Sequence, residues 1–158
     1  MTSADLLLLA GVFVGGALPW LEAVVVIPLG IIAGLHPVVV TIVAIVGNLA
    51  TVAVAAWFGE RMREWWIKRR RERGKVVSPE QHSKGWGRVE RIMTRWGLPA
   101  LAILGPLGLG TQVSALVAVS LGVSARLSFI WVSAGTIAWS VLAAIATVAG
   151  LSFLGVGG

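Results

Sequence analysis

A single carboxylate lies in an otherwise uncharged stretch of this sequence. Glu22 is the only Asp, Glu, Lys or Arg between Leu6 and Gly59, and Pro19 and Pro28 flank it. A charged side chain at the centre of a bilayer costs about 2.5–3.5 kcal/mol on insertion scales, so such residues usually face a cavity, a partner or an ion path. A glutamate there can exchange a proton for a cation, which is the simplest transport chemistry. Alternatively, Glu22 caps the helix that follows Pro19, because a carboxylate in the first turn is favoured by the helix dipole.

The second half of the chain offers polar but uncharged groups at the matching place. An offset of 88 residues pairs Glu22 with Gly110, and it pairs Asn48 with Thr136. Asn48 and Thr136 either line the same cavity or form a hydrogen bond that only packs two helices together. We interpret five residues as candidates for binding a substrate or an ion: Glu22, Asn48, Thr111, Gln112 and Ser114.

The residue types that enzymes and metal sites need are scarce. The chain has two histidines, His36 and His82, and no cysteine. Neither histidine has Asp or Glu neighbours at the spacing of metal ligands, and the glycine-rich stretch 105–110 lacks the Lys-Ser/Thr ending of a phosphate-binding loop. We therefore expect no enzymatic activity, no metal site and no cofactor.

Composition places the chain in a membrane. Of its 158 residues, 57% are hydrophobic and 13% are charged, against roughly 25% charged in an average soluble domain. Twelve of the 13 Lys and Arg residues fall within 60–95, between two long apolar stretches. Basic residues collect in short cytoplasmic loops of membrane proteins. We therefore expect a multi-pass protein of the bacterial inner (plasma) membrane with segment 60–95 in the cytoplasm, and no nucleic-acid partner.

Prolines and glycines divide each apolar stretch into a broken part and a long helix. In the first stretch the breaks predict a short hairpin over 6–35, followed by a span over 38–58. The run Pro28-Leu-Gly30 is expected to keep the second arm of this hairpin irregular. In the second, the run from Gly105 to Gly110 predicts a hairpin over 98–123, followed by a span over 124–148. The hairpin arms are too short for a hydrocarbon core of about 30 Å.

This recurring pattern predicts an internal repeat and three regions. The regions are a first membrane repeat (1–59), a basic cytoplasmic or interfacial segment (60–95) and a second membrane repeat (96–158). In the favoured topology each repeat is a re-entrant helical hairpin plus one transmembrane helix, so the second repeat is inverted. In the alternative each repeat makes two kinked spans. The predicted fold class is thus an all-α integral membrane protein with two inverted repeats joined by a basic amphipathic segment.

The basic segment is expected to be largely helical. Residues 59–75 continue the first span, 74–87 form a linker, and 85–97 form an amphipathic helix on the membrane surface. Its arginines either bind anionic lipid headgroups or only orient the protein. The candidate headgroup residues are Arg88, Arg91, Arg95 and Arg126.

Part of the first half resembles a known family. Glu22, Pro28-Leu29-Gly30, Gly34, Pro37 and Gly47-Asn48 occur in the order of the N-terminal signature of the small multidrug export protein family. The second half is similar to that family's Gly/Pro-rich hairpin and, more distantly, to the DedA-like (SNARE-associated, VTT) family. Two departures stand out: the export family often has Leu-Arg where Ala23-Val24 stand, and the DedA-like family often has an arginine in the second hairpin, where 96–125 carries no charge.

Three functions follow from these observations. The resemblance implies a small multidrug exporter, and the lone acid Glu22 indicates the proton or cation site of a transporter for amphiphilic or cationic small molecules. The DedA-like likeness implies a translocase of phospholipid or a polyprenyl-phosphate lipid carrier. A membrane assembly factor without substrate is the third. With two full spans per chain, a substrate path is expected to need a homodimer embedded in the bilayer.

Overall fold

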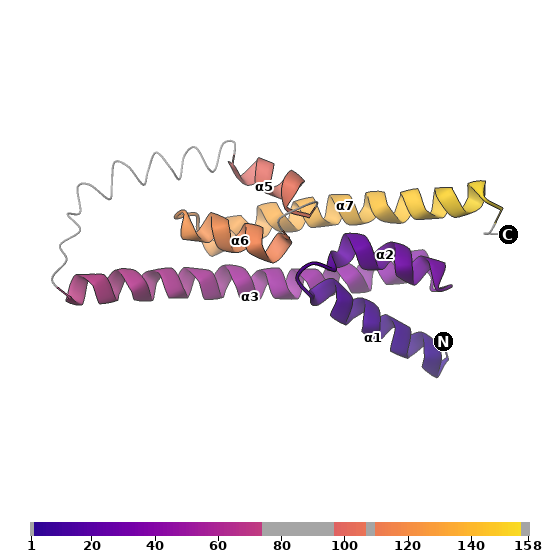
Figure 1. The fold of residues 1–158 in the computed structure, drawn as a ribbon, viewed down its shortest axis with the longest axis horizontal. Coiled ribbons are helices and arrows are strands. Elements are labelled where there is room, and N and C mark those ends of the chain that lie inside the picture. The colour runs from indigo at the N-terminus through magenta and orange to yellow at the C-terminus, as the bar shows by residue number, and fades with distance from the viewer. Residues whose placement is uncertain (1, 74–96, 107–109, 156–158) are drawn as a thin grey trace.

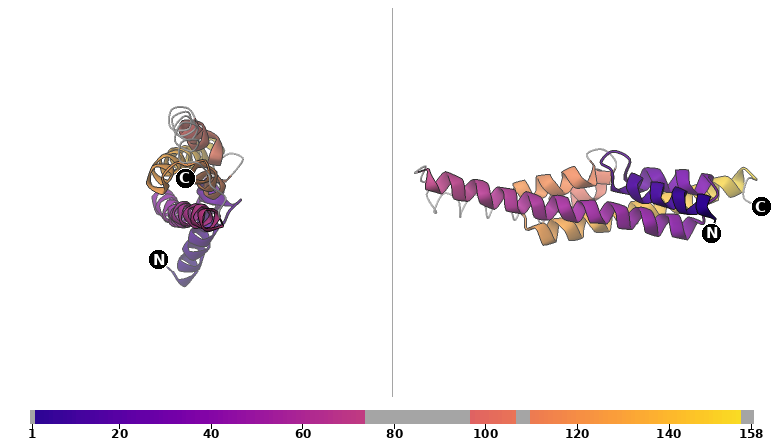
Figure 2. Two further views of the ribbon diagram at one scale, coloured as in Figure 1. Left: turned by 90° about the vertical axis from the view of Figure 1, so that its left-hand side faces the viewer. Right: turned by 90° about the horizontal axis from the view of Figure 1, so that it is seen from below.

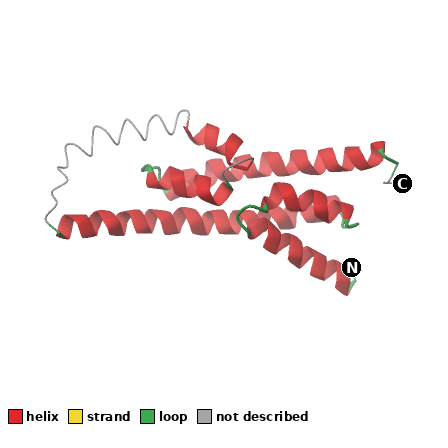
Figure 3. Ribbon diagram, in the orientation of Figure 1, coloured by secondary structure: helices red, strands yellow, loops and turns green. Residues whose placement is uncertain are grey.

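The described part of the chain consists of helices. The computed structural model describes residues 2–73, 97–106 and 110–155, and every element in these ranges is an α-helix (Figures 1 and 3). In chain order the helices are α1 (Ser3–Ala17), α2 (Glu22–Ile32), α3 (Pro37–Glu72), α5 (Leu98–Leu104), α6 (Thr111–Ser120) and α7 (Ala125–Phe153). The all-helical prediction is therefore confirmed for these ranges. The proposed surface helix at 85–97 and the linker at 74–87 lie almost entirely outside the described residues.

Two long helices, α3 and α7, form the frame of the molecule. They pack against each other and run in opposite directions (Figures 1 and 2). Each contains an 18-residue window that is apolar enough to cross a membrane. α3 begins where Pro37 fixes the first helical φ after the extended residue His36. It continues past the 59/60 boundary of the predicted regions and through the basic residues to Glu72.

Two helical hairpins lie on opposite halves of this frame. α1 and α2 pack on the half that contains the start of α3, and α5 and α6 pack on the other half (Figures 1 and 2). At 15, 11, 7 and 10 residues, all four helices are shorter than the roughly 20 residues that cross a bilayer. The end of α1 and the start of α6 meet near the middle of the frame, where the Gln112 amide donates to the carbonyl oxygen of Ala17 at 3.5 Å.

One local expectation is wrong. Pro28-Leu-Gly30 was predicted to keep the second arm irregular, but α2 is a continuous α-helix with Pro28 inside it. A proline removes one helical hydrogen bond, yet it is tolerated in membrane helices when neighbouring helices surround the freed backbone. α2 has such neighbours, because it packs on α1, α3 and α7.

The turns that follow α2 and α6 have the same backbone hydrogen bonds. Gly34 and Gly122 adopt φ of +90° and +104°, where a residue without Cβ is favoured. After α2, the N–H of residues 33, 34 and 35 donates to the carbonyl of residues 29, 31 and 30. After α6, the N–H of residues 121, 122 and 123 donates to the carbonyl of residues 117, 119 and 118. Every donor and acceptor is displaced by 88 residues, the offset found in the sequence.

Close backbone contacts at glycines set the positions of the hairpins. A methyl group on Gly16 of α1 would lie 2.6 Å from the carbonyl oxygen of Ala44 in α3. A methyl group on Gly47 would overlap the carbonyl oxygen of Phe13, and one on Gly135 would overlap that of Ala102. Small residues allow such close helix approach in membranes. The crossing of α1 and α3 places the carbonyl of Gly16 beside Asn48.

Candidate functional site

The carboxylate of Glu22 lies at the meeting point of the two hairpins. Glu22 is 4% exposed and is the first residue of α2. One carboxylate oxygen, Oε1, accepts a hydrogen bond from the backbone N–H of Thr111, the first residue of α6. Within the described residues no side chain caps α2. Glu22 therefore lies in the first turn of its own helix, as predicted, but its carboxylate accepts a hydrogen bond from α6 in the other hairpin.

The backbone on both sides of this contact is unusual. Trp20 and Glu22 have φ of +86° and +45°, and a non-glycine residue in this region costs roughly 1–3 kcal/mol. Gly110, which precedes α6, has φ of +87°, and a methyl group on it would lie 3.5 Å from Glu22 Oε1. Glycine therefore suits this position in both its backbone angle and its closeness to the carboxylate.

The second oxygen of Glu22 is different from the first. Oε2 is buried and has no hydrogen-bond partner among the residues that the structure describes. A buried polar oxygen without a partner costs about 1–3 kcal/mol, and more when it is charged. The site therefore holds the carboxyl group by one oxygen and leaves the other without a described partner.

Asn48 connects both hairpins to the two long helices. Its amide nitrogen donates to the carbonyl oxygen of Gly16 at 3.2 Å and to the Thr111 hydroxyl at 3.0 Å. Its amide oxygen lies 3.4 Å from the Thr136 hydroxyl of α7. Asn48, Thr111 and Thr136 are all buried. Four helices (α1, α3, α6 and α7) therefore meet at one fully buried amide.

Gln112 extends this network, whereas Ser114 does not. The Gln112 amide donates to the Thr51 hydroxyl at 3.0 Å, and its oxygen lies 3.1 Å from the Thr111 hydroxyl. Ser114 is buried without a described hydrogen-bond partner, and its hydroxyl faces Gly105 of the α5–α6 turn. Four of the five candidates thus lie together, with Ser114 to one side.

The sequence comparison decides the family. Residues 22–142, which make up most of the chain, match the family described as "Putative small multi-drug export protein". The chain belongs to this family. The match begins at Glu22 and contains every residue of the polar network except the carbonyls of Gly16 and Ala17. No curated protein and no solved structure matches the chain.

Membership of the small multi-drug export family and the two long apolar helices indicate a membrane protein. Of the four candidate headgroup arginines, Arg126 is exposed at the start of α7. Arg88, Arg91 and Arg95 lie outside the described residues. In the ranges that the structure describes, no three His, Cys, Asp or Glu side chains come together as metal ligands would.

Two further residues form described side-chain hydrogen bonds and were not among the candidates. Thr51 follows Asn48 by three residues, a spacing that places both on one face of a helix. Glu60 of α3 accepts a hydrogen bond from the backbone N–H of Ala125 at 3.1 Å and so caps α7. The three-residue spacing from Asn48 could have identified Thr51 from the sequence. Glu60 is one of several acids in the basic segment, and no pattern marks it.

Proposed function

We propose that this protein is a membrane transporter that exports amphiphilic or cationic compounds in exchange for protons, with Glu22 as its intramembrane ion site. The observation that carries this proposal is the unequal surroundings of the two Glu22 oxygens. The N–H of Thr111 holds Oε1, while Oε2 is buried without a described partner. A carboxyl group that is fixed by one oxygen can bind a proton on the other, or attract a cation once that proton has left.

We further propose that the chain has a re-entrant, inverted-repeat topology. The long helices are antiparallel, the hairpin helices are too short to span, and the turns after α2 and α6 repeat at an offset of 88 residues. In this topology the end of α3 that carries Arg69, Arg70 and Arg71 is cytoplasmic, as the distribution of basic residues favours. The hairpin turns, with Glu22 and Thr111, then lie near the middle of the bilayer.

Accessibility of single introduced cysteines tests this topology, because the native chain contains none. In the re-entrant topology a membrane-impermeant thiol reagent reaches position 73 from the cytoplasmic side, and positions 3, 36 and 155 from the other side. In the four-span alternative, positions 3 and 155 also react from the cytoplasmic side. That result would refute the re-entrant topology.

Transport in proteoliposomes tests the role of Glu22. Ethidium, an aromatic cation, serves as the substrate, and a pH gradient supplies the driving force. The Glu22→Gln variant keeps an oxygen that accepts from the N–H of Thr111, but it cannot release a proton. We expect it to lose transport that depends on the gradient. Glu60→Gln is the matched control, because Glu60 also caps a helix but lies outside the network.

The outcome separates transport from the alternatives. Wild-type rates and an unchanged dependence on the pH gradient in Glu22→Gln would refute Glu22 as the ion site. Acceleration of a labelled anionic phospholipid across the bilayer, without ethidium transport, would instead favour the lipid translocase.

A further inference from the structure

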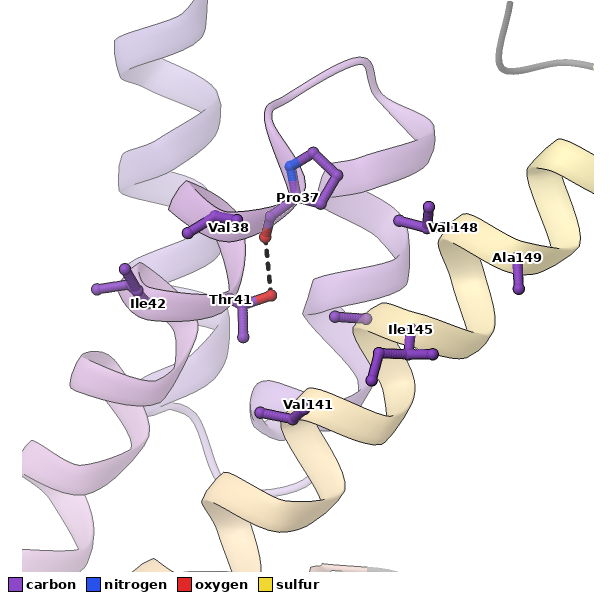
Figure 4. A pocket seen from close by; sticks show the side chains of 9 residues that line it. Pro37, Val38, Thr41, Ile42, Val141, Ile145, Val148 and Ala149 are labelled. Atoms are coloured by element: carbon purple, nitrogen blue, oxygen red, sulfur yellow. Dashed lines mark hydrogen bonds between the residues drawn. The ribbon is translucent and has the colours of Figure 1, made fainter.

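An apolar groove separates α3 and α7 at the end of the molecule away from the basic residues of α3. Its volume is about 530 Å³, within the range of pockets for small molecules. Ile42 and its neighbours line one side and Val141, Ile145 and Val148 line the other (Figure 4). The Thr41 hydroxyl is the polar side-chain group in this lining, and it donates to the carbonyl oxygen of Pro37 at 2.8 Å. The groove therefore presents hydrocarbon to a ligand.

The same place at the other end of the frame is filled. At the 88-residue offset, Thr41 corresponds to Phe129 and Ile145 corresponds to Trp57. The rings of Trp57 and Phe129 contact each other across α3 and α7, with centroids 5.5 Å apart and planes at 57°. The repeat-related position therefore accommodates aromatic rings, and two of the protein's own rings occupy it.

A second pair of positions closes that end further. Pro37 and Val148, which line the open groove, correspond to Ala125 and Glu60. The Glu60 carboxylate accepts from the N–H of Ala125 at 3.1 Å and so joins α3 to α7 there. Pro37 has no N–H to donate, and Val148 has no side-chain acceptor. The open groove thus lacks both an aromatic pair and a hydrogen bond between α3 and α7, the two contacts that close the equivalent place at the other end.

The inner end of the groove lies close to the level of the Glu22 site along the frame. On α3, Ile42 is six residues, or about 9 Å along the helix, from Asn48. On α7, Val141 is five residues, or about 8 Å, from Thr136. Asn48 bonds to Thr111, whose N–H donates to Glu22. A ligand with rings in the groove and a cationic group at its inner end would therefore direct that charge toward the network.

From the contrast between the two ends we infer that the α3–α7 groove binds the aromatic part of an amphiphilic cation, and that the Trp57–Phe129 pair closes the equivalent place at the basic end. The inference deepens the proposed transport function and rests on it for the role of the ligand. The binding site itself can be tested without transport.

Photolabelling in proteoliposomes tests the binding site. The probe is a phenyl diazirine that carries a trimethylammonium group, and mass spectrometry locates the labelled residues. In the wild type we expect labelling at 37–42 and 141–149 that ethidium competes away. The double variant Thr41→Phe, Ile145→Trp copies the closed end into the open groove, and we expect it to reduce this labelling at least tenfold. Ile145→Trp alone should give an intermediate loss, so the test does not depend on one variant folding.

The matched control adds the same bulk outside the groove. Val46 and Leu142 are exposed on the same two helices and do not line the groove, so Val46→Phe, Leu142→Trp should label as the wild type does. The converse variant Phe129→Thr, Trp57→Ile should gain labelling at 53–61 and 125–130. Far-UV circular dichroism confirms that each variant is helical.

Three outcomes would overturn the inference. The first is undiminished labelling in both filled-groove variants. The second is equal labelling by a diazirine phosphatidylcholine that ethidium does not displace, which would assign the groove to a lipid acyl chain. The third is a crosslink between two chains through Ile145→Cys that excludes the probe, which would assign it to a second copy. Groove labelling that persists in Glu22→Gln, whatever that variant's transport, supports the binding site independently of the proton site.

Discussion

The crossing of α1 and α3 depends on Gly16, and replacing it with alanine should destabilise the protein measurably. A Cβ at Gly16 would lie 2.6, 3.1 and 3.2 Å from the oxygen, Cα and carbonyl carbon of Ala44. All three are backbone atoms, so no side-chain rotation can relieve the contact. α1 must move by about 0.8 Å to reach an ordinary contact of 3.4 Å, and overpacking of this kind costs about 1–3 kcal/mol.

The same shift acts on the polar network. The carbonyl of Gly16 accepts from the Asn48 amide at 3.2 Å, so moving α1 by nearly an ångström lengthens that hydrogen bond beyond its useful range. Alanine also favours helix by up to about 1 kcal/mol over glycine. The net loss for Gly16→Ala is thus about 1–2 kcal/mol, which raises the unfolding equilibrium constant roughly 5–30-fold.

Gly11→Ala is the matched control on the same helix. A Cβ at Gly11 has nothing within 4 Å, so this variant should be as stable as the wild type or more stable. The assay is reversible unfolding in mixed micelles, titrated with sodium dodecyl sulfate and followed by far-UV circular dichroism. If Gly16→Ala unfolds at the same denaturant fraction as Gly11→Ala, the close backbone contact does not exist and the reasoning fails.

Five further variants are checked by the same unfolding assay. Asn48→Ala removes the amide that joins four helices and should cost about 0.6–2 kcal/mol; wild-type stability would mean that the network is not formed. Gly34→Ala and Gly122→Ala force a Cβ into a left-handed backbone conformation at equivalent turns, so each should cost about 1–2 kcal/mol, and a loss at one turn alone would count against their equivalence. Glu60→Ala removes the side-chain acceptor for the N–H of Ala125 and should cost about 0.5–2 kcal/mol, whereas Glu60→Gln, which keeps an acceptor, should cost less.

The sequence predicted the helix breaks well, because local chemistry determines them. Pro37 after an extended residue, the turn glycine Gly122 and the Gly/Pro run that starts at Gly105 each restrict the backbone wherever they occur. Pro28 was misread because its effect is not local: packing of α2 against α1, α3 and α7 decides whether a proline inside a membrane helix breaks it. The end of α3 at Glu72 agrees with the predicted helical continuation of the first span.

The sequence identified the residues of the candidate site better than it predicted how they contact one another. The 88-residue offset placed Glu22 opposite Gly110, next to Thr111, and these residues do meet. That the carboxylate caps α6 and not α2 depends on how two hairpins dock, which no local pattern encodes. The assignment of Asn48 was left between cavity and packing, and the structure adds that its amide hydrogen-bonds to Gly16 of α1 and Thr111 of α6.

The capping of α6 by Glu22 also has a consequence for biosynthesis. The carboxylate and its donor are separated by 89 residues, and a ribosome adds roughly 5–20 residues per second, so roughly 4–18 s pass between their synthesis. During that interval the first half of the nascent chain carries an acid whose partner does not yet exist. Pairing of Glu22 with Thr111 is therefore a late step of assembly, and a chain that stops before residue 111 would expose an unpaired acid to the cell's quality control.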